Sequence, residues 1–243
     1  RLSIGCQSFD NSILKLLGRI HSVDDIYNSY KAARSAGFMN INLDLIFSVP
    51  GQNMQMLQND LDKITSLNPE HISLYSLIWE ENTPFHSMMT SGTLSPSDES
   101  LESEMYQHII EYLTSKGYIH YEISNFCKPG YESRHNNIYW QNKNYTGVGL
   151  GASGYLQNMR YKNYEDFTLY FDSLDKNELP VMEKEFLTPK DTLEYEFILG
   201  LRLLETGIDL KKIEKYYDNC EVYLKIAENL IETGFLLPRN GNI

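Results

Sequence analysis

The segment 132–140, with the sequence ESRHNNIYW, combines one histidine, two amides and two large aromatic rings shortly after a proline–glycine turn. A neutral imidazole can ligate a metal ion, and aromatic rings can pack against a flat ligand. In an alternative interpretation, His135 caps a turn while Tyr139 and Trp140 belong to the core. The segment is therefore a candidate binding site, predicted to lie in a loop-rich region.

A second group of polar side chains follows from the alternation in three predicted strands, 2–9, 40–47 and 71–77, because successive side chains of a strand point to opposite faces. One face is apolar and should meet the helices. The other face carries polar or small residues: Ser3, Gly5 and Gln7, Asn42 and Asp44, and Ser73 and Tyr75. An unpaired carboxylate in mid-strand would be costly inside a packed sheet. We therefore expect a curved sheet whose inner wall lines a ligand cavity; a solvent-facing antiparallel sheet is the alternative.

The elements that position these residues alternate between strand and helix. A fourth strand is predicted over 118–126, and helices are predicted over about 23–36, ending at Gly37, and from Ser95 onward with a stripe of Leu101, Met105, Ile109 and Leu113. Right-handed crossovers would make all four strands parallel. The predicted fold class is α/β: part of a parallel, partial TIM-like barrel followed by a small helical, winged-helix-like appendage.

Three regions are expected along the chain. Residues 1–126 form the second half of a partial barrel, and 127–189 connect it to a helical region over 190–243. The connecting region holds ESRHNNIYW and the glycine-rich run 147–154, which is a weak motif by itself. Both ends are typical of a fragment, since the chain begins inside an apparent strand and 235–243 predicts a strand and an Asn–Gly turn without a return strand.

The composition limits which classes of binding partner and which cellular compartment the sequence predicts. A net charge of −12 argues against nucleic acid and anionic membrane surfaces, which are themselves negative. The sequence has no apolar run long enough to span a bilayer and no signal-peptide pattern, which predicts a soluble, cytoplasmic protein. The three cysteines, Cys6, Cys127 and Cys220, are far apart in sequence, as free thiols of a reducing compartment would be.

Several segments occur in the order and spacing of a known family: RLSIGCQSF, LGRIH and NLDLIFSVPG, followed by HISLYSL, YEISNF, SRHNNIYW and GVGLGASGY. They resemble the radical S-adenosylmethionine proteins related to oxygen-independent coproporphyrinogen III oxidase. The resemblance covers nearly the whole chain. It implies a partial barrel that binds S-adenosylmethionine near the carboxyl ends of its strands, where ligands of barrel proteins lie.

The resemblance assigns Gln7, Arg19 and Asp44 to side-chain contacts with S-adenosylmethionine, and Ile78 to a backbone contact. The separation of strand faces had already put Gln7 and Asp44 on the inner wall. A purely structural pair of Asp44 with Arg19 is the alternative.

The H-N-x-x-Y-W pattern resembles a motif of the haem chaperones in this family. It implies that His135, Asn136, Tyr139 and Trp140 contact haem, with His135 as iron ligand and an unidentified haem-accepting protein as partner. Two alternatives stay open: the oxidase of porphyrin biosynthesis itself, and a structural module that binds neither ligand.

Radical chemistry in this family needs a Cys-x3-Cys-x2-Cys segment that holds a [4Fe–4S] cluster. The sequence contains no such segment, and its separate cysteines cannot replace it. We therefore expect that the chain as written does not cleave S-adenosylmethionine reductively.

Overall fold

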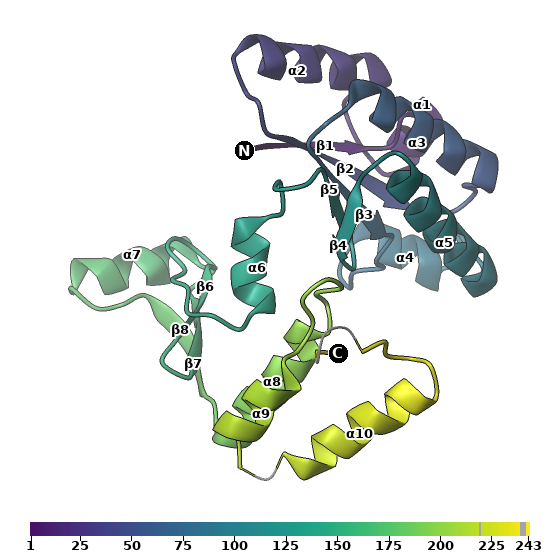
Figure 1. The fold of residues 1–243 in the computed structure, drawn as a ribbon. Helices are drawn as coiled ribbons and strands as arrows, with labels where there is room; N and C mark the ends of the chain where they lie inside the picture. The colour runs from purple at the N-terminus through teal and green to yellow at the C-terminus, as the bar shows by residue number, and fades with distance from the viewer. Residues whose placement is uncertain (219, 239–241) are drawn as a thin grey trace. The chain divides into compact units, whose positions relative to one another are not determined.

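The computed structural model describes residues 1–218, 220–238 and 242–243, which form two compact units, 1–132 and 133–243. Figure 1 shows the fold of both. Each unit has its own sheet and its own apolar core, so each is described separately. None of the helices in the described residues is long and apolar enough to cross a membrane.

The first unit is a five-stranded sheet with helices between its strands. The sheet has the order β1-β2-β3-β5-β4, in which β1, β2 and β3 are parallel and β5 runs antiparallel to both of its neighbours. The elements are β1 (Leu2–Gln7), α1 (Asn11–Leu16), α2 (Val23–Ser35), β2 (Ile41–Phe47), α3 (Met54–Leu67), β3 (His71–Ser76), α4 (Pro84–Thr90), α5 (Glu99–Ser115), β4 (Ile119–Glu122) and β5 (Asn125–Cys127). The predicted α/β class with a parallel sheet is confirmed for β1 to β3.

The core of this unit lies between the apolar face of β1 to β3 and helices α2, α3 and α5. The predicted stripe of α5 is confirmed, because Met105, Ile109 and Leu113 are fully buried and Leu101 packs against them. Helix α2 begins with a capping box at Ser22 and ends before Gly37, close to its predicted limits. The apolar residues predicted to face the helices from β1, β2 and β3 are part of this core, so that part of the face assignment is confirmed.

The prediction of one parallel strand over 118–126 was wrong. This segment forms two short strands, β4 and β5, which pair antiparallel with each other around a turn at 123–124. The alternation of apolar and polar residues breaks at this turn, because Ser124 and Asn125 are both polar, and this break was the signal that the prediction missed. Antiparallel strands need only a tight turn between them, whereas a parallel pair needs a crossover.

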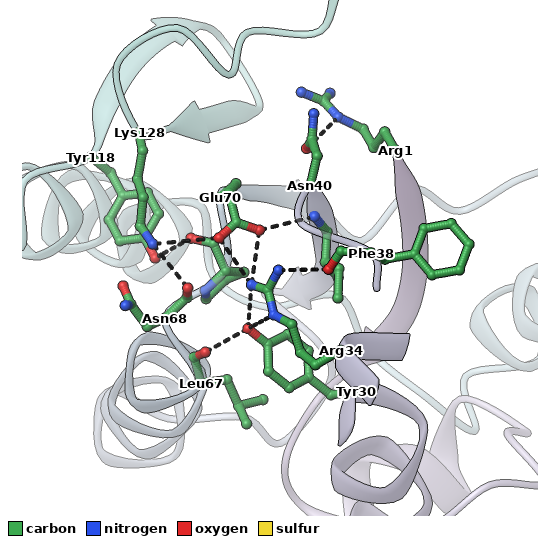
Figure 2. A network of polar contacts seen from close by, with 12 residues as sticks. Arg1, Tyr30, Arg34, Phe38, Asn40, Leu67, Asn68, Glu70, Tyr118 and Lys128 are labelled. Carbon is green, nitrogen blue, oxygen red and sulfur yellow. Dashed lines mark hydrogen bonds and ion pairs between the residues drawn. The ribbon is translucent and has the colours of Figure 1, made fainter. Parts of the chain in front are cut away.

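A polar network lies at the end of the sheet where β2 and β3 begin (Figure 2). Glu70 accepts hydrogen bonds from the Ile41 backbone amide at 3.0 Å and from Arg34 at 2.9 Å, and Lys128 lies 3.7 Å from it. Arg34 also donates to the Tyr30 hydroxyl, at 2.6 Å for its closest nitrogen. The network joins α2 to the amino ends of two strands, a position that favours stability over catalysis in barrel-like folds.

The second unit combines a three-stranded antiparallel sheet, β6-β7-β8, with helices on either side of it in sequence. Its elements are α6 (Arg134–Trp140), β6 (Ser153–Leu156), β7 (Met159–Asn163), α7 (Phe167–Asp175), β8 (Val181–Phe186), α8 (Pro189–Gly200), α9 (Leu210–Tyr216) and α10 (Glu221–Glu232). Helices α8 to α10 share a core that includes Leu193, Ile213 and Ala227.

Two local predictions in this unit need correction. The segment ESRHNNIYW is not part of a loop, because 134–140 forms helix α6, capped by the Ser133 hydroxyl. A strand was predicted at the start of 235–243, but 235–238 is irregular. The predicted Asn–Gly turn at 240–241 lies outside the described residues.

Candidate functional site

The polar face of the first unit carries a hydrogen-bonded ladder that joins β4, β3 and β2, with β5 lying between β4 and β3 in the sheet. Nδ1 of His71, on β3, lies 2.7 Å from Oδ1 of Asn42, on β2, and Nε2 of His71 lies 2.8 Å from the Tyr121 hydroxyl, on β4. Nδ2 of Asn42 donates in turn to Oδ1 of Asp44 at 2.7 Å. Three of these four side chains are buried, and Asp44, which ends the ladder, is half-buried.

Burial keeps the His71 ring neutral. The side chain is 2% exposed, and its desolvation, with the charge of Arg1 as a smaller cause, lowers its pKa from 6.5 to about 3. A neutral imidazole has one donor and one acceptor nitrogen, as the ladder requires. Sequence reasoning overlooked His71, although it shares a strand face with Ser73 and Tyr75.

Gln7 and Asp44 lie on neighbouring strands, as predicted. The backbone register pairs Gly5 with Asp44 and Gln7 with Leu45, with an irregularity between Gly5 and Gln7. Gln7 has a positive φ of 66°, and a Cβ added at Gly5 would lie 2.6 Å from the Gln7 side-chain nitrogen. The missing side chain of Gly5 therefore gives the Gln7 amide room to fold back over the strand position that pairs with Asp44.

Arg19 and Ile78 lie outside the regular strands. Arg19 is exposed and follows Gly18 after α1, and Ile78 is 75% exposed, two residues beyond the end of β3. Among the described residues, no ion pair joins Arg19 to Asp44. The structural pair considered as an alternative is thus not formed, and the carboxylate of Asp44 is held by Asn42 instead.

Together, Gln7 and Asp44 suit a polar organic ligand. An amide can donate and accept hydrogen bonds, and a half-buried carboxylate with one oxygen already held presents its second oxygen as an acceptor. Hydroxyl and amino groups, such as those of a nucleoside or an amino acid, match this donor and acceptor set. The residues therefore fit the adenosyl and amino acid parts of S-adenosylmethionine.

The cysteines do not fit an iron–sulfur cluster. Cys6 and Cys127 are fully buried, and desolvation raises the pKa of each thiol to about 12, which opposes the thiolate form that binds iron. Within the described residues, no three His, Cys, Asp or Glu side chains lie close enough to hold a metal ion. No reaction step through a cluster can be assigned to these side chains.

The second candidate site lies on helix α6. His135 and Tyr139 are four residues apart and therefore share one helix face. Nε2 of His135 lies 2.7 Å from the Tyr139 hydroxyl, and the Tyr139 ring packs edge-on against Tyr145 with 4.5 Å between centroids. His135 is exposed and Tyr139 is half-buried, so this imidazole is accessible to a ligand and is not a core residue.

Asn136 and Trp140 form a second pair on α6, also four residues apart. The guanidinium of Arg202 lies over the Trp140 ring at 4.4 Å, and both Nε1 of Trp140 and Nε of Arg202 are buried without a hydrogen-bond partner. The backbone amide of Asn136 is capped by Ser133 at 3.3 Å. The motif therefore presents His135 outward and uses Trp140 to pack within its unit.

The glycine-rich run has a packing role. A Cβ at Gly154 would overlap the ring of Tyr161, and one at Gly147 would overlap the backbone of Ser153. The Tyr161 hydroxyl also accepts a hydrogen bond from the Gly147 amide at 3.0 Å. These glycines let a loop lie flat on its own sheet.

Comparisons with known proteins show which proteins the chain is similar to. Residues 1–64 match the Radical SAM superfamily. The chain is 41% identical to the heme chaperone HemW of Lactococcus lactis over 96% of this chain and 60% of that protein. It is 40% identical to HemW of Escherichia coli over 97% of this chain and 61% of that protein. Its fold matches a solved structure of coproporphyrinogen III oxidase (HemN) from Escherichia coli, with a TM-score of 0.78 and 21% identity, over 100% of this chain and 59% of that one.

The class of protein that these matches indicate is limited to similarity: residues 1–64 resemble the Radical SAM superfamily, and the whole chain shares the fold of the solved oxidase structure. Proteins named heme chaperone HemW from several bacteria are similar to nearly the whole length of the chain. The chain spans about three fifths of the length of these relatives.

Proposed function

We propose that the protein is a haem carrier in which His135 ligates the haem iron and the ring of Tyr139 packs beside the macrocycle. The observation that carries this proposal is the pairing of the two side chains on one accessible face of α6, in a chain similar to proteins named heme chaperone. Imidazole is a common axial ligand of haem iron, and tyrosine rings pack well against flat apolar surfaces.

In this proposal the bound haem passes to an acceptor protein. An exposed ligand suits transfer, because an acceptor can approach the iron without unfolding the carrier. Packing of Trp140 against Arg202 holds α6 in its unit, so that the exposed pair keeps its orientation. Asn136 and Trp140 would add further contacts to the haem.

The proposal gives the first unit a separate task, which is to bind S-adenosylmethionine on the polar face of its sheet. Strands β1 to β3 would belong to an open barrel, and helices α8 to α10 to a winged-helix-like appendage. Gln7 and Asp44 would contact polar groups of the ligand, with Arg19 and the Ile78 backbone at the edge of the site. S-adenosylmethionine bound to a [4Fe–4S] cluster supplies radical chemistry in this superfamily, but the cysteines of this chain do not form the ligand set.

A haem titration tests the carrier function. Haem added to the protein should produce a shifted Soret band that saturates at one haem per chain. His135→Ala should weaken binding more than about tenfold, because even supporting partners of metal ligands contribute 10- to 100-fold. His86→Ala, which removes a half-buried histidine from α4, is the matched control and should bind as the unmodified protein does.

An enzyme assay separates this proposal from its rival. Conversion of coproporphyrinogen III by a longer form of the protein that carries the Cys-x3-Cys-x2-Cys segment and its reconstituted cluster would favour an oxidase. Haem binding that depends on His135, without any such conversion, would favour a carrier.

A further inference from the structure

We propose that His71 is a positioning residue for ligand binding at Asp44, and that it acts through Asn42 as the middle of the Tyr121–His71–Asn42–Asp44 ladder. The inference rests on the proposed binding of S-adenosylmethionine to the polar face of the first unit. It assigns a task to a buried histidine that neither the haem site nor the direct ligand contacts use.

The neighbours of Asn42 determine which way its amide points. Its Nδ2 lies 2.7 Å from the Asp44 carboxylate, which can only accept a hydrogen bond when ionised, so this atom must be the donor. If the amide were flipped, its oxygen would face the carboxylate oxygen instead. The orientation with Nδ2 toward Asp44 is therefore the one that satisfies both the Asn42 amide and the Asp44 carboxylate.

The tautomer of His71 follows from that orientation. Oδ1 of Asn42 is an acceptor, so Nδ1 of His71, 2.7 Å away, must carry the proton. Nε2 of His71 is then an acceptor, and the Tyr121 hydroxyl at 2.8 Å donates to it. Every hydrogen bond of the ladder thus has a defined direction, from Tyr121 to Asp44.

A serine hydroxyl makes a second contact at each end of the Asn42 amide and is compatible with the same arrangement. The Ser73 hydroxyl donates to Oδ1 at 3.2 Å, and Nδ2 donates to the Ser3 hydroxyl at 3.3 Å. Asn42 is 6% exposed, and His71 and Ser73 are each 2% exposed, so water cannot readily replace the two partners of Oδ1. The amide that holds Asp44 is therefore locked before any ligand binds.

A locked carboxylate binds more tightly than a mobile one, because the ligand does not have to order it. Hydrogen bonds to a charged group are also the stronger kind. One oxygen of Asp44 is held by Asn42, which leaves the other free to accept from the ligand. Without His71, Asn42 could rotate and the carboxylate would lose its fixed direction.

Equilibrium binding of S-adenosylhomocysteine to the whole chain, measured by calorimetry or ligand-observed NMR, tests the ladder without any radical reaction. His71→Leu should weaken binding about five- to tenfold, the cost of one lost hydrogen bond to a charged or buried group. His71→Asn should restore most of the affinity, because the Asn side-chain nitrogen takes the place of Nδ1 and can still donate to Asn42.

Two further variants separate positioning from general loss of stability. Tyr118→Phe removes a buried hydroxyl that donates to the Pro69 carbonyl at 2.8 Å, three residues from Tyr121 but outside the ladder. It should lower the free energy of unfolding and leave affinity unchanged. In an Asp44→Ala background, His71→Leu should have no further effect on affinity, since the residue through which it acts is gone.

Two results would overturn the ladder. One is equal affinity of His71→Leu and the unmodified protein for S-adenosylhomocysteine, and the other is an equal loss of affinity caused by His71→Leu in the unmodified protein and in the Asp44→Ala background. If the unmodified protein does not bind S-adenosylhomocysteine at all, the proposed ligand site fails together with the ladder. Binding by the unmodified protein that is insensitive to His71 overturns the ladder alone.

Discussion

The hydroxyl oxygen of Tyr139 lies 2.7 Å from Nε2 of His135, one turn away on helix α6. The two rings meet nearly edge-on, with 4.8 Å between their centroids. The nitrogen proposed to ligate iron is therefore already hydrogen-bonded within the helix. Haem binding through Nε2 must break this hydrogen bond.

Tyr139→Phe should consequently tighten haem binding through Nε2 by about fivefold, the equivalent of a net hydrogen bond of about 1 kcal/mol. The phenyl ring keeps the apolar surface, so only the competing hydroxyl is lost. Haem titrations of the variant and of Tyr170→Phe, on α7 of the same unit, provide the comparison. Weaker binding by Tyr139→Phe would mean that the hydroxyl itself supports the haem.

Glu70 should be important for the stability of the first unit. Glu70→Gln keeps the shape but replaces a charged acceptor of the Ile41 amide and Arg34 by a neutral one, and should lower the free energy of unfolding by about 1–3 kcal/mol. Lys128→Gln should cost less than about 1 kcal/mol, because this ion pair is longer and its lysine is partly exposed. Urea unfolding measures both, and equal losses would contradict the central position of Glu70 in the network.

Asp60 should make stability depend on pH in a defined window. This carboxylate is buried on α3, where it accepts from the Ser8 hydroxyl at 2.8 Å and the Phe9 amide at 2.7 Å. Desolvation outweighs these hydrogen bonds and raises its pKa from 3.8 to about 6. Between these values the folded protein binds a proton that the unfolded chain does not.

The free energy of unfolding should therefore fall as the pH rises from about 4 to 6, by up to about 3 kcal/mol from this group. Asp60→Asn should lack this decline, whereas Asp62→Asn, an exposed position on the same helix, should keep it. Urea unfolding across the window is the measurement. An unchanged pH slope in Asp60→Asn would show that other groups produce it.

Gly154→Ala should destabilise the second unit, because the added methyl group would overlap the Tyr161 ring. Overpacking of this kind costs about 1–3 kcal/mol. The adjacent exposed change Ser153→Ala should stay within about 0.5 kcal/mol of the unmodified protein. Thermal unfolding of the two variants distinguishes them, and equal melting temperatures would contradict the close contact.

Much of the first unit could be predicted from the sequence, because strands β1 to β3 have apolar side chains on one face and polar ones on the other. The turn at 123–124 was missed although the alternation breaks there, where the polar residues Ser124 and Asn125 are adjacent. The sequence of β3 also contained a signal for His71, because His71 and Ser73 are two residues apart and lie on the same face of the strand. A buried histidine is recognisable only once its partners, Asn42 and Tyr121, are brought together by pairing between strands.

The helix that carries ESRHNNIYW was harder to predict. A nearby proline–glycine turn and two adjacent amides favour a loop, and a seven-residue helix has little propensity to outweigh them. The spacing of His135 to Tyr139 and of Asn136 to Trp140 was the available helical signal. Packing of Trp140 against Arg202 provides the tertiary contact that local propensity cannot show.

Ligation of haem iron by His135 is the central claim, and resonance Raman spectroscopy of the ferrous haem complex tests it most directly. An iron–histidine stretching band should shift to lower frequency when the protein is labelled with ¹⁵N-histidine, and it should disappear in His135→Ala. A band that persists unchanged in His135→Ala, or a complex with no histidine-dependent band, would contradict the claim.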